Sequence, residues 1–349
     1  MVEFSLRPME PSDGSAIDAL MRNEAQTTSF GITTRYGLDV YEALLAQHAT
    51  FFGVVATSPG VDGLVGMATA FIDDVNVGGR RYPSAHLENL KVRHDFRRQG
   101  LGARLAAWRI DEARRRFDRD GIIVTGIEGS NTASLATAGR WSTEILGPLR
   151  ILIARVAAKP PGARSADIRP LQLEDLDLVV DAVNSYYRDY ELYPPQTAAG
   201  LASLLGPTSL GEPIRHYRVA VARDGTIVAG AAVTERFKLM TDHVNSIPLP
   251  LDLLTRVVPL FPRDHVIRTI ELSLAWHAPG QVRAGRQLWD SIRHEWRDRA
   301  THVGATVDPR GSLMEMLHVG PTLAPTLRIK VPVQSPVPID EQHLVYFWR

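Results

Sequence analysis

Hydrophobic positions follow a helical period over residues 101–117. One row of apolar residues is spaced by four and three, and a second row continues beside it at four, three and four; the rows are Leu101, Leu105 and Trp108, and Ala106, Ile110, Ala113 and Phe117. Together they form one broad apolar face, which predicts an amphipathic helix. The segment "HLENLKV" (86–92) before it and the apolar segment "GIIVTGIE" (121–128) after it each predict a strand.

This pattern of elements occurs twice along the chain. Residues 6–20 are echoed by residues 168–183, residues 51–71 by 217–233, and residues 86–92 by 269–275. The first pair predicts a short strand followed by a helix, and the second predicts a hairpin. The third pair aligns without a gap, so that Glu88 falls on Glu271 and Gly102 on Gly285. Three blocks in the same order predict a tandem duplication.

A segment rich in proline and glycine joins the two copies. Residues 158–166 lie within "AAKPPGARSAD" and predict a linker. The linker divides the chain into a first domain, residues 1–157, and a second domain, residues 167–349, which suits a length of 349 residues. The second copy has an insertion at 241–264 and is expected to end on a strand at 343–349.

Composition narrows the classes of partner and chemistry. With 39 Lys and Arg against 39 Asp and Glu, the net charge is zero, so no global field attracts nucleic acid or an anionic membrane. The absence of cysteine excludes disulfides, thiolate metal sites and a cysteine nucleophile, and His294 is not followed by the second histidine of a zinc helix. We therefore expect no metal. No signal peptide or apolar run of membrane length is present, which indicates a cytoplasmic protein.

The loop before the predicted helix combines arginines with glycines. The first N–H groups of a helix have no internal partner and carry partial positive charge. Gly100 and Gly102 lack a Cβ, so a ligand can approach those N–H groups, and Arg97 and Arg98 add positive charge. The loop therefore predicts a site for an anion of pyrophosphate size. The spacing matches neither the dinucleotide fingerprint nor a Walker A loop. A glycine turn with a solvated basic face is the alternative.

The spacing Val92-x4-Arg97-x2-Gly100-x-Gly102, between an apolar strand and an amphipathic helix, resembles motif A of the GNAT superfamily of N-acetyltransferases. The similarity extends over "HLENLKVRHDFRRQGLGARL", and the order of elements fits the family over most of residues 4–156. The resemblance implies an α/β fold, a mixed, mostly antiparallel twisted sheet flanked by helices. The duplication implies two tandem GNAT-like domains of this fold.

The resemblance also implies the cofactor, acetyl-CoA, and the residues that bind it. The main chain of the strand would pair with the pantetheine arm, the N–H groups after it would hold the pyrophosphate, and an asparagine would contact the cofactor further on. These residues are Leu90, Lys91 and Val92; Arg97, Arg98, Gln99, Gly100, Leu101, Gly102 and Ala103; and Asn131. Asn131 also suits a helix N-cap.

Glu88 is the candidate general base, because an alkylammonium acceptor must lose a proton before it attacks a thioester. An ion pair with a nearby arginine, or a solvent-facing position, is the alternative role of this carboxylate. Many family members have a tyrosine as the acid toward the thiolate, whereas this chain has Thr137 and Ala138 in that region. The general acid is therefore missing or replaced.

The second copy departs from the motif. Arg283 falls on Gly100, Arg286 on Ala103 and Met314 on Asn131, so we expect residues 167–349 to keep the fold and to bind CoA poorly. The sequence thus predicts an acetyltransferase that acts from its first domain on an amine, less readily a hydroxyl, of a small molecule. The alternative is a non-catalytic acyl-CoA-binding or assembly protein. A longer acyl group and a homodimer are both compatible with the sequence.

Overall fold

Each of the two units of the chain combines segments that lie far apart in the sequence. The computed structural model describes residues 3–23, 26–27, 31–118, 120–160, 162, 165–246, 262–318 and 327–347. The first unit comprises Met1–Leu146, Leu239–Val266 and Ile329–Ile339, and the second comprises Gly147–Lys238, Ile267–Arg328 and Asp340–Arg349. The predicted linker, 158–166, lies inside the second unit. The division into domains 1–157 and 167–349 stays a prediction.

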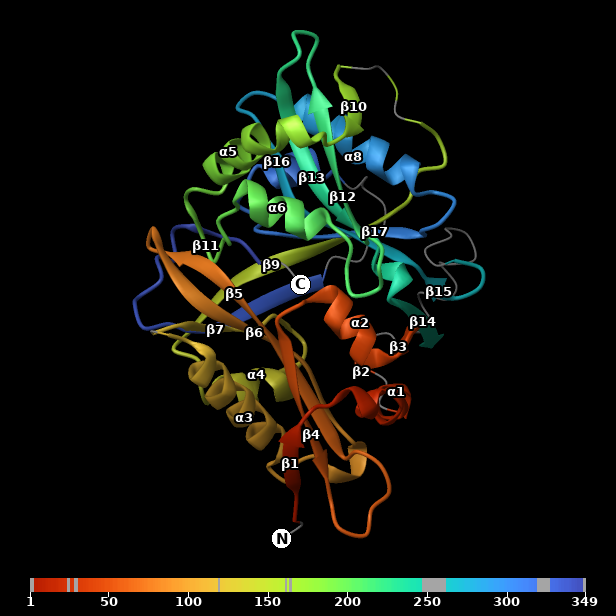
Figure 1. Cartoon of the computed structure of the whole chain (residues 1–349), viewed down its shortest axis with the longest axis vertical. Helices are drawn as coiled ribbons and strands as arrows, with labels where there is room; N and C mark the ends of the chain where they lie inside the picture. Colours follow the sequence, from red (N-terminus) through yellow and green to blue (C-terminus); the bar gives the residue numbers. More distant parts are fainter. Residues whose placement is uncertain are drawn as a thin grey trace. The chain divides into compact units, whose positions relative to one another are not determined.

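The first unit is built on a mixed, mostly antiparallel sheet (Figure 1). Its strands lie in the order β1 (Ser5–Pro8), β4 (Phe51–Thr57), β5 (Gly66–Val77), β6 (Arg80–Val92), β7 (Ile122–Val124) and β18 (Leu327–Gln334). Neighbours run antiparallel except β6 and β7, which are parallel. The short strand β8 (Ile127–Glu128) also pairs with β18, and β3 (Gly31–Tyr36) pairs with β2 (Gln26–Thr27) and β14 (Met240–Ser246) in a smaller sheet.

Helices cover both faces of this sheet (Figure 1). On one face, α1 (Gly14–Asn23) and α2 (Val40–Gln47) bury Ile17 and Leu44 against Val55 of β4. On the other face, α3 (Leu101–Arg116) buries Leu101 against Val54, the neighbouring residue of β4. Since successive strand side chains point to opposite faces, the apolar strand β4 requires cover on both sides. α4 (Thr132–Ala138) contacts α3.

The second unit repeats this order of strands. It runs β9 (Glu144–Arg155), β17 (His302–Val307), β16 (Thr269–His277), β13 (Ile227–Thr234), β12 (Arg215–Val221) and β10 (Asp167–Pro170). Only β16 and β17 run parallel among these neighbours. The helices are α5 (Leu176–Tyr186), α6 (Ala198–Leu205), α8 (Val282–Glu295) and α9 (Leu313–Met316), and β11 (Tyr190–Glu191) pairs with β19 (Leu344–Val345). β15 (Val266–Ile267) precedes β16.

The duplication predicted from the sequence is visible in one repeated ion pair. Arg7 donates two hydrogen bonds to Asp13 at 2.7 and 2.6 Å, and Asp13 also accepts from the N–H of Glu10. Arg169 binds Asp175 in the same way at 2.5 and 3.0 Å, again with a main-chain N–H three residues earlier. In each unit this contact joins the first strand to the first helical turn. The predicted α/β class with two tandem copies of one fold is confirmed.

The last strand of each copy lies in the other unit. β9 follows α4 in the chain, yet it pairs with β17 of the second unit from His302↔Arg155 to Val307↔Arg150. β18 comes from the second copy, yet it pairs with β7 and β8 of the first unit. The predicted insertion contributes β14 to the first unit, and its residues 247–261 lie outside the described residues. The predicted final strand is limited to Leu344–Val345, and residues 348 and 349 are likewise outside them.

We expect Asp175→Asn to lower the free energy of unfolding by about 2 kcal/mol at pH 7, because two charge-assisted hydrogen bonds are lost. The Arg169 guanidinium holds the pKa of the Asp175 carboxyl below its usual range. A depressed folded-state pKa contributes stability above the unfolded pKa, about 4, and that stability is lost as the pH falls through the folded pKa. Denaturant titrations of the two proteins should therefore converge in acid.

The matched control is Asp298→Asn, since Asp298 is 77% exposed and pairs at 3.2 Å with Arg297. It should change stability by no more than about 0.5 kcal/mol. Equal effects of the two substitutions would contradict a structural role for the repeated pair.

Candidate functional site

Two parallel strands of the first unit separate at the centre of its sheet. Pairing between β6 and β7 runs from Ser84↔Ile122 to His86↔Val124, and β6 then continues to Val92 paired only with β5 on its other side. Just past the separation, the Thr125 hydroxyl donates to the carbonyl of Leu87 at 2.8 Å. The end of β6 that carries the predicted pantetheine residues Leu90, Lys91 and Val92 therefore lies beyond the parallel pairing, where an extended ligand can reach its main chain.

A β-bulge marks the same point on β6. Thr69 of β5 pairs with Glu88, but the next regular pair is Met67↔Lys91, so β6 holds one extra residue. Asn89 adopts a φ of 48°, and its amide Nδ2 donates to the Thr69 hydroxyl at 3.1 Å. The bulge bends the strand and locates Glu88, the candidate base, where β6 turns away from its neighbour.

Arg109 of α3 holds this bulge from the opposite face. Its guanidinium Nη1 donates to the carbonyls of Thr69 and Glu88 at 2.8 and 2.7 Å, and the residue is only 3% exposed. Burial lowers the pKa of Arg109 to about 9, which the charge of Glu88 opposes, so the group is still a cation at pH 7. Arg109 was not among the residues predicted from the sequence. Its signal was an arginine four residues after Leu105, on the apolar face of the helix.

The face of the sheet that carries Glu88 also carries buried ionisable groups. By strand alternation, His86 and Ser84 share this face with Glu88, and Phe71 and Asp73 lie opposite them on β5. The ring of His86 stacks on Phe71 with centroids 4.6 Å apart, and burial lowers its pKa to about 4, so it is neutral at pH 7. Burial raises the pKa of Asp73 to about 6. Asp73, which the sequence analysis did not select, is thus a second carboxyl able to exchange protons near neutral pH.

The start of α3 presents a row of main-chain N–H groups. Within the described residues, the N–H groups of residues 98–103 have no hydrogen-bond acceptor. Gly100 precedes the helix with a φ of 83°, and a Cβ added there would meet nothing within 4 Å. Arg97 donates from Nε to the carbonyl of Val92 at 3.1 Å, which braces the turn. We call these N–H groups the cradle; their partial positive charge suits a phosphate group.

Asn131 has the helix-capping role that the sequence left open. Its side-chain oxygen accepts from the N–H of Ser134 at 3.1 Å and so begins α4. The residue is exposed, so its Nδ2 is available to a ligand as well. In the region where the family resemblance leads us to look for a tyrosine, the hydroxyl of Thr137 donates to the carbonyl of Ala133 at 3.1 Å and Ala138 is buried.

The second unit contains a corresponding bulge, which corrects the gapless alignment. Ala232 pairs with Ser273, the next regular pair is Gly230↔Trp276, and Leu274 has a φ of 47°. The bulge register therefore aligns Ser273, not Glu271, with Glu88. The helices keep their original alignment, since Leu105 and Leu288 are both fully buried. The loop between strand and helix is thus two residues shorter in the second copy, which a gapless alignment cannot represent.

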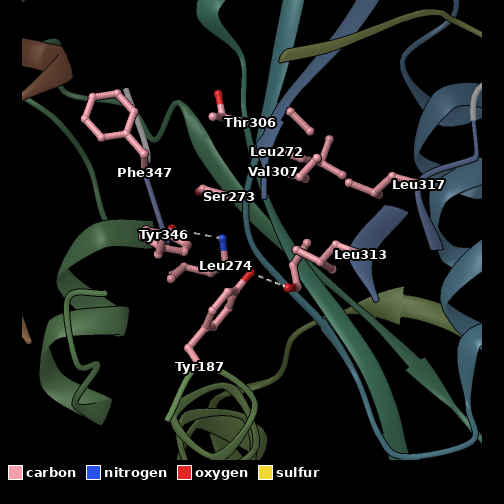
Figure 2. Close-up of a pocket in the computed structure, with 12 residues that line it drawn as sticks. Tyr187, Leu272, Ser273, Leu274, Thr306, Val307, Leu313, Leu317, Tyr346 and Phe347 are labelled. Carbon is pink, nitrogen blue, oxygen red and sulfur yellow. Dashed lines mark hydrogen bonds between the residues drawn. The ribbon is translucent and has the colours of Figure 1, made fainter. Parts of the chain in front are cut away.

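The corresponding cleft of the second unit is filled by its own side chains (Figure 2). Tyr187, Leu313, Leu317 and Tyr346 line it, and its cavity volume is about 10 Å³, close to the minimum that holds one water. Tyr187 comes from the tyrosine-rich segment 185–195 and belongs to the core of the second unit.

The start of α8 is covered as well. A Cβ on Gly285 would lie 2.9 Å from Cγ of Met316, whereas a Cβ on Gly102 of the first unit would meet no atom closer than 3.8 Å. Arg286 further donates to the carbonyl of Glu315 at 2.7 Å. The second copy therefore has no open counterpart of the cradle within the described residues.

Comparison with known proteins bears on the family and the fold. The model of the acetyltransferase (GNAT) family matches residues 18–140. A crystal structure of Saccharomyces cerevisiae N-myristoyltransferase with bound myristoyl-CoA matches with a TM-score of 0.64 and 12% identity over 100% of this chain and 90% of that one. A GCN5-related N-acetyltransferase from Sphaerobacter thermophilus matches with a TM-score of 0.55 and 17% identity over 97% and 98%. One from Kribbella flavida gives 0.52 and 14% over 95% and 71%.

At these identities the solved structures establish the fold. No curated protein matches the chain. None of the described helices is long and apolar enough to cross a membrane. In the described ranges, no group of three His, Asp or Glu residues is placed to hold a metal ion.

Arg109→Met tests whether the hydrogen bonds from the Arg109 guanidinium stabilise the bulge. Loss of the guanidinium leaves two buried carbonyls without their charged donor, so we expect the free energy of unfolding to fall by about 2–4 kcal/mol. Arg115→Met is the control, because Arg115 is 62% exposed and pairs with Glu112 on the same helix. It should cost less than about 1 kcal/mol in the same urea titration. If Arg109→Met lowered the free energy of unfolding no more than the control does, the hydrogen bonds of Arg109 to the bulge would not stabilise the fold.

Proposed function

Since residues 18–140 match the model of the acetyltransferase (GNAT) family, we propose that the chain is an acetyl-CoA-dependent N-acetyltransferase whose catalytic site lies in its first unit. The family supports acyl transfer from CoA. We place the catalytic site in the first unit because the cradle at the start of α3 is open, whereas the start of α8 in the second unit is covered. The acceptor we propose is the amine of a small molecule, since a chain of zero net charge has no field to collect a strongly charged polymer.

The proposed donor pose follows the strand and the helix. The pyrophosphate is held by the N–H groups of residues 98–103, with Arg98 beside them. The pantetheine arm runs along the main chain of Leu90, Lys91 and Val92, beyond the last β6–β7 pair. The thioester then lies near the bulge, and the amide of Asn131, the residue that caps α4, contacts the cofactor. No metal takes part in the proposed step.

The proposed chemistry is direct attack by the amine. An alkylammonium, with a pKa of about 10.4, first gives a proton to Glu88, directly or through a water. The nitrogen then bonds to the thioester carbon, the carbon–sulfur bond breaks, and CoA leaves as a thiolate, which takes the second proton from the nitrogen as the amide forms. Because a thiol has a pKa of about 8.5, this leaving group needs no strong acid, which is consistent with a site that lacks the family's tyrosine. The carboxylate of Asp73, ionised above about pH 6, favours a cationic acceptor on the same face.

A longer acyl donor is the second candidate. The Saccharomyces cerevisiae N-myristoyltransferase structure, which holds myristoyl-CoA, matches the full length of this chain. Titration with acyl-CoAs of increasing chain length separates the two donors. A non-catalytic acyl-CoA-binding protein would bind the donor without turning it over, and the second experiment below detects that outcome.

We expect calorimetric titration of acetyl-CoA to show one site in the wild type and at least about 30-fold weaker binding in Gly100→Val. The substitution strains a left-handed residue and places a branched side chain over the N–H groups. The matched control is Gly280→Val in the corresponding loop of the second copy, because Gly280 has a φ of 74° and equally open surroundings. Two sites in the wild type, or loss of binding in Gly280→Val, would contradict the assignment to the first unit.

Glu88→Gln tests the base. With a panel of primary amines as acceptors, release of CoA should slow by about 100-fold or more, because a positioned general base contributes at least this much. A thiol reagent reports the released CoA without background, since the chain has no cysteine. The exposed Glu42→Gln on α2 should keep the wild-type rate. An unchanged rate in Glu88→Gln would remove Glu88 from the mechanism, and no turnover by the wild type with any amine would favour the binding protein.

A further inference from the structure

Three side chains of the second unit form a hydrogen-bonded relay at the end of β16. His277, the last residue of that strand, lies with Nε2 3.1 Å from the hydroxyl of Ser312. The same hydroxyl is 2.8 Å from the hydroxyl of Tyr186 on α5. The other ring nitrogen of His277, Nδ1, is 3.0 Å from the carbonyl oxygen of Ala278. The Tyr190 hydroxyl extends the chain of contacts through Tyr186.

When the imidazole of His277 is neutral, its partners set the direction of each proton in this relay. A carbonyl oxygen can only accept, so Nδ1 of His277 carries the ring proton and Nε2 presents a lone pair. Ser312 therefore donates its hydroxyl proton to Nε2. Its oxygen in turn accepts from the hydroxyl of Tyr186, which would stabilise negative charge on that oxygen. This is the arrangement of a serine whose proton is held by a histidine base that a third group orients.

The exposure of the two residues suits this chemistry. His277 is 7% exposed and Ser312 is partly buried, so the base is sheltered from bulk solvent. Ser312 directly precedes α9, where a serine commonly caps the helix, but its side chain makes no capping bond. Its next residue, Leu313, lines the small apolar cleft of Figure 2.

The relay lies at the strand end that corresponds to the proposed pantetheine-binding end of β6 in the first copy. By the bulge registers, Gly230↔Trp276 and Ala229↔His277 correspond to Met67↔Lys91 and Gly66↔Val92. His277 therefore takes the position of Val92, a residue of the first unit with no proton to exchange. The second copy, in which the start of α8 is covered, thus has the imidazole of His277 at the end of β16.

We propose that Ser312 is a nucleophile activated by His277, and that the second unit accepts short acyl groups from activated carboxylic esters. The Ser312 oxygen bonds to the acyl carbon while its proton passes to Nε2 of His277. The bond between the acyl carbon and the leaving oxygen then breaks, and that oxygen takes the proton from His277. Water repeats the sequence on the acyl-serine, with its proton passing through His277 back to the serine oxygen, and releases the acid. Tyr186 acts as a positioning residue.

The first experiment treats the full chain with p-nitrophenyl acetate and maps the acetylated peptides by mass spectrometry. Acetylation at Ser312 should be the fastest in the chain and should slow by about 100-fold in His277→Gln. Ser312→Ala should abolish that adduct, while Ser203→Ala, at an exposed serine of α6, should leave it unchanged. Acetylation of Ser312 no faster than that of Ser203, or an adduct insensitive to His277→Gln, would overturn the proposal.

A second pair of variants keeps the test independent of folding defects. The chain has no cysteine, so Ser312→Cys and Ser203→Cys each contain a single thiol. A thiol that shares its proton with a histidine reacts as a thiolate well below the ordinary pKa of about 8.5. Iodoacetamide at pH 6 should therefore modify Ser312→Cys at least about 10-fold faster than Ser203→Cys, and His277→Gln should remove that advantage. Tyr186→Phe should reduce it, since the hydroxyl that stabilises the anion is gone. Equal rates for the two thiols would refute an activated position at 312.

Discussion

The bulge in the central strand of each unit is the constraint on which both sites depend. An extra residue bends the strand, and the parallel pairing with the next strand ends on one side of the bend. Such a bend exposes main-chain carbonyls inside the protein, and these need donors. In the first unit one buried guanidinium, that of Arg109, supplies them. In the second unit the hydroxyls of Tyr187 and Tyr217 do so, at the carbonyls of Ala275 and Leu274. The choice of donor then determines what space is left around the strand.

Arg109 approaches its bulge from the helix side, so the other face remains available for Glu88, His86 and Asp73. The tyrosines of the second unit belong to its core, and with Met316 and Leu313 they fill the place that a cofactor would need. One fold therefore carries two different surfaces at the same strand end, an open row of N–H groups in one copy and a Ser–His–Tyr relay in the other. A duplicated chain can keep both, because each copy supplies its own donors to the main-chain carbonyls around its bulge.

Local and periodic features could be predicted from the sequence. The apolar rows after Gly100 located α3, whose bounds are Leu101–Arg116, and the glycine spacing located the cradle. The repeated Arg–Asp contacts agree with the duplication read from the sequence. Pairings between distant segments could not be predicted. β9 and β18 lie in the units opposite to their own copies, and no local pattern encodes which sheet edge a strand joins. The bulges show that the strand alignment differs by two residues from the gapless one, so that Ser273, and not Glu271, corresponds to Glu88. Arg109 was overlooked because an arginine on the apolar face of a helix looks like a break in the hydrophobic pattern. Its buried carbonyl acceptors are visible only in the structure.

The central claim is that the first copy binds acyl-CoA through the N–H groups of residues 98–103 and that the second copy does not. Hydrogen–deuterium exchange of the full chain, with and without saturating acetyl-CoA, measures those groups directly. The account predicts that binding protects the amides of residues 98–103 from exchange, because each becomes a donor to phosphate, while the amides of residues 280–286 exchange at the same rate in both samples. Protection at residues 280–286, or none at residues 98–103, would contradict it.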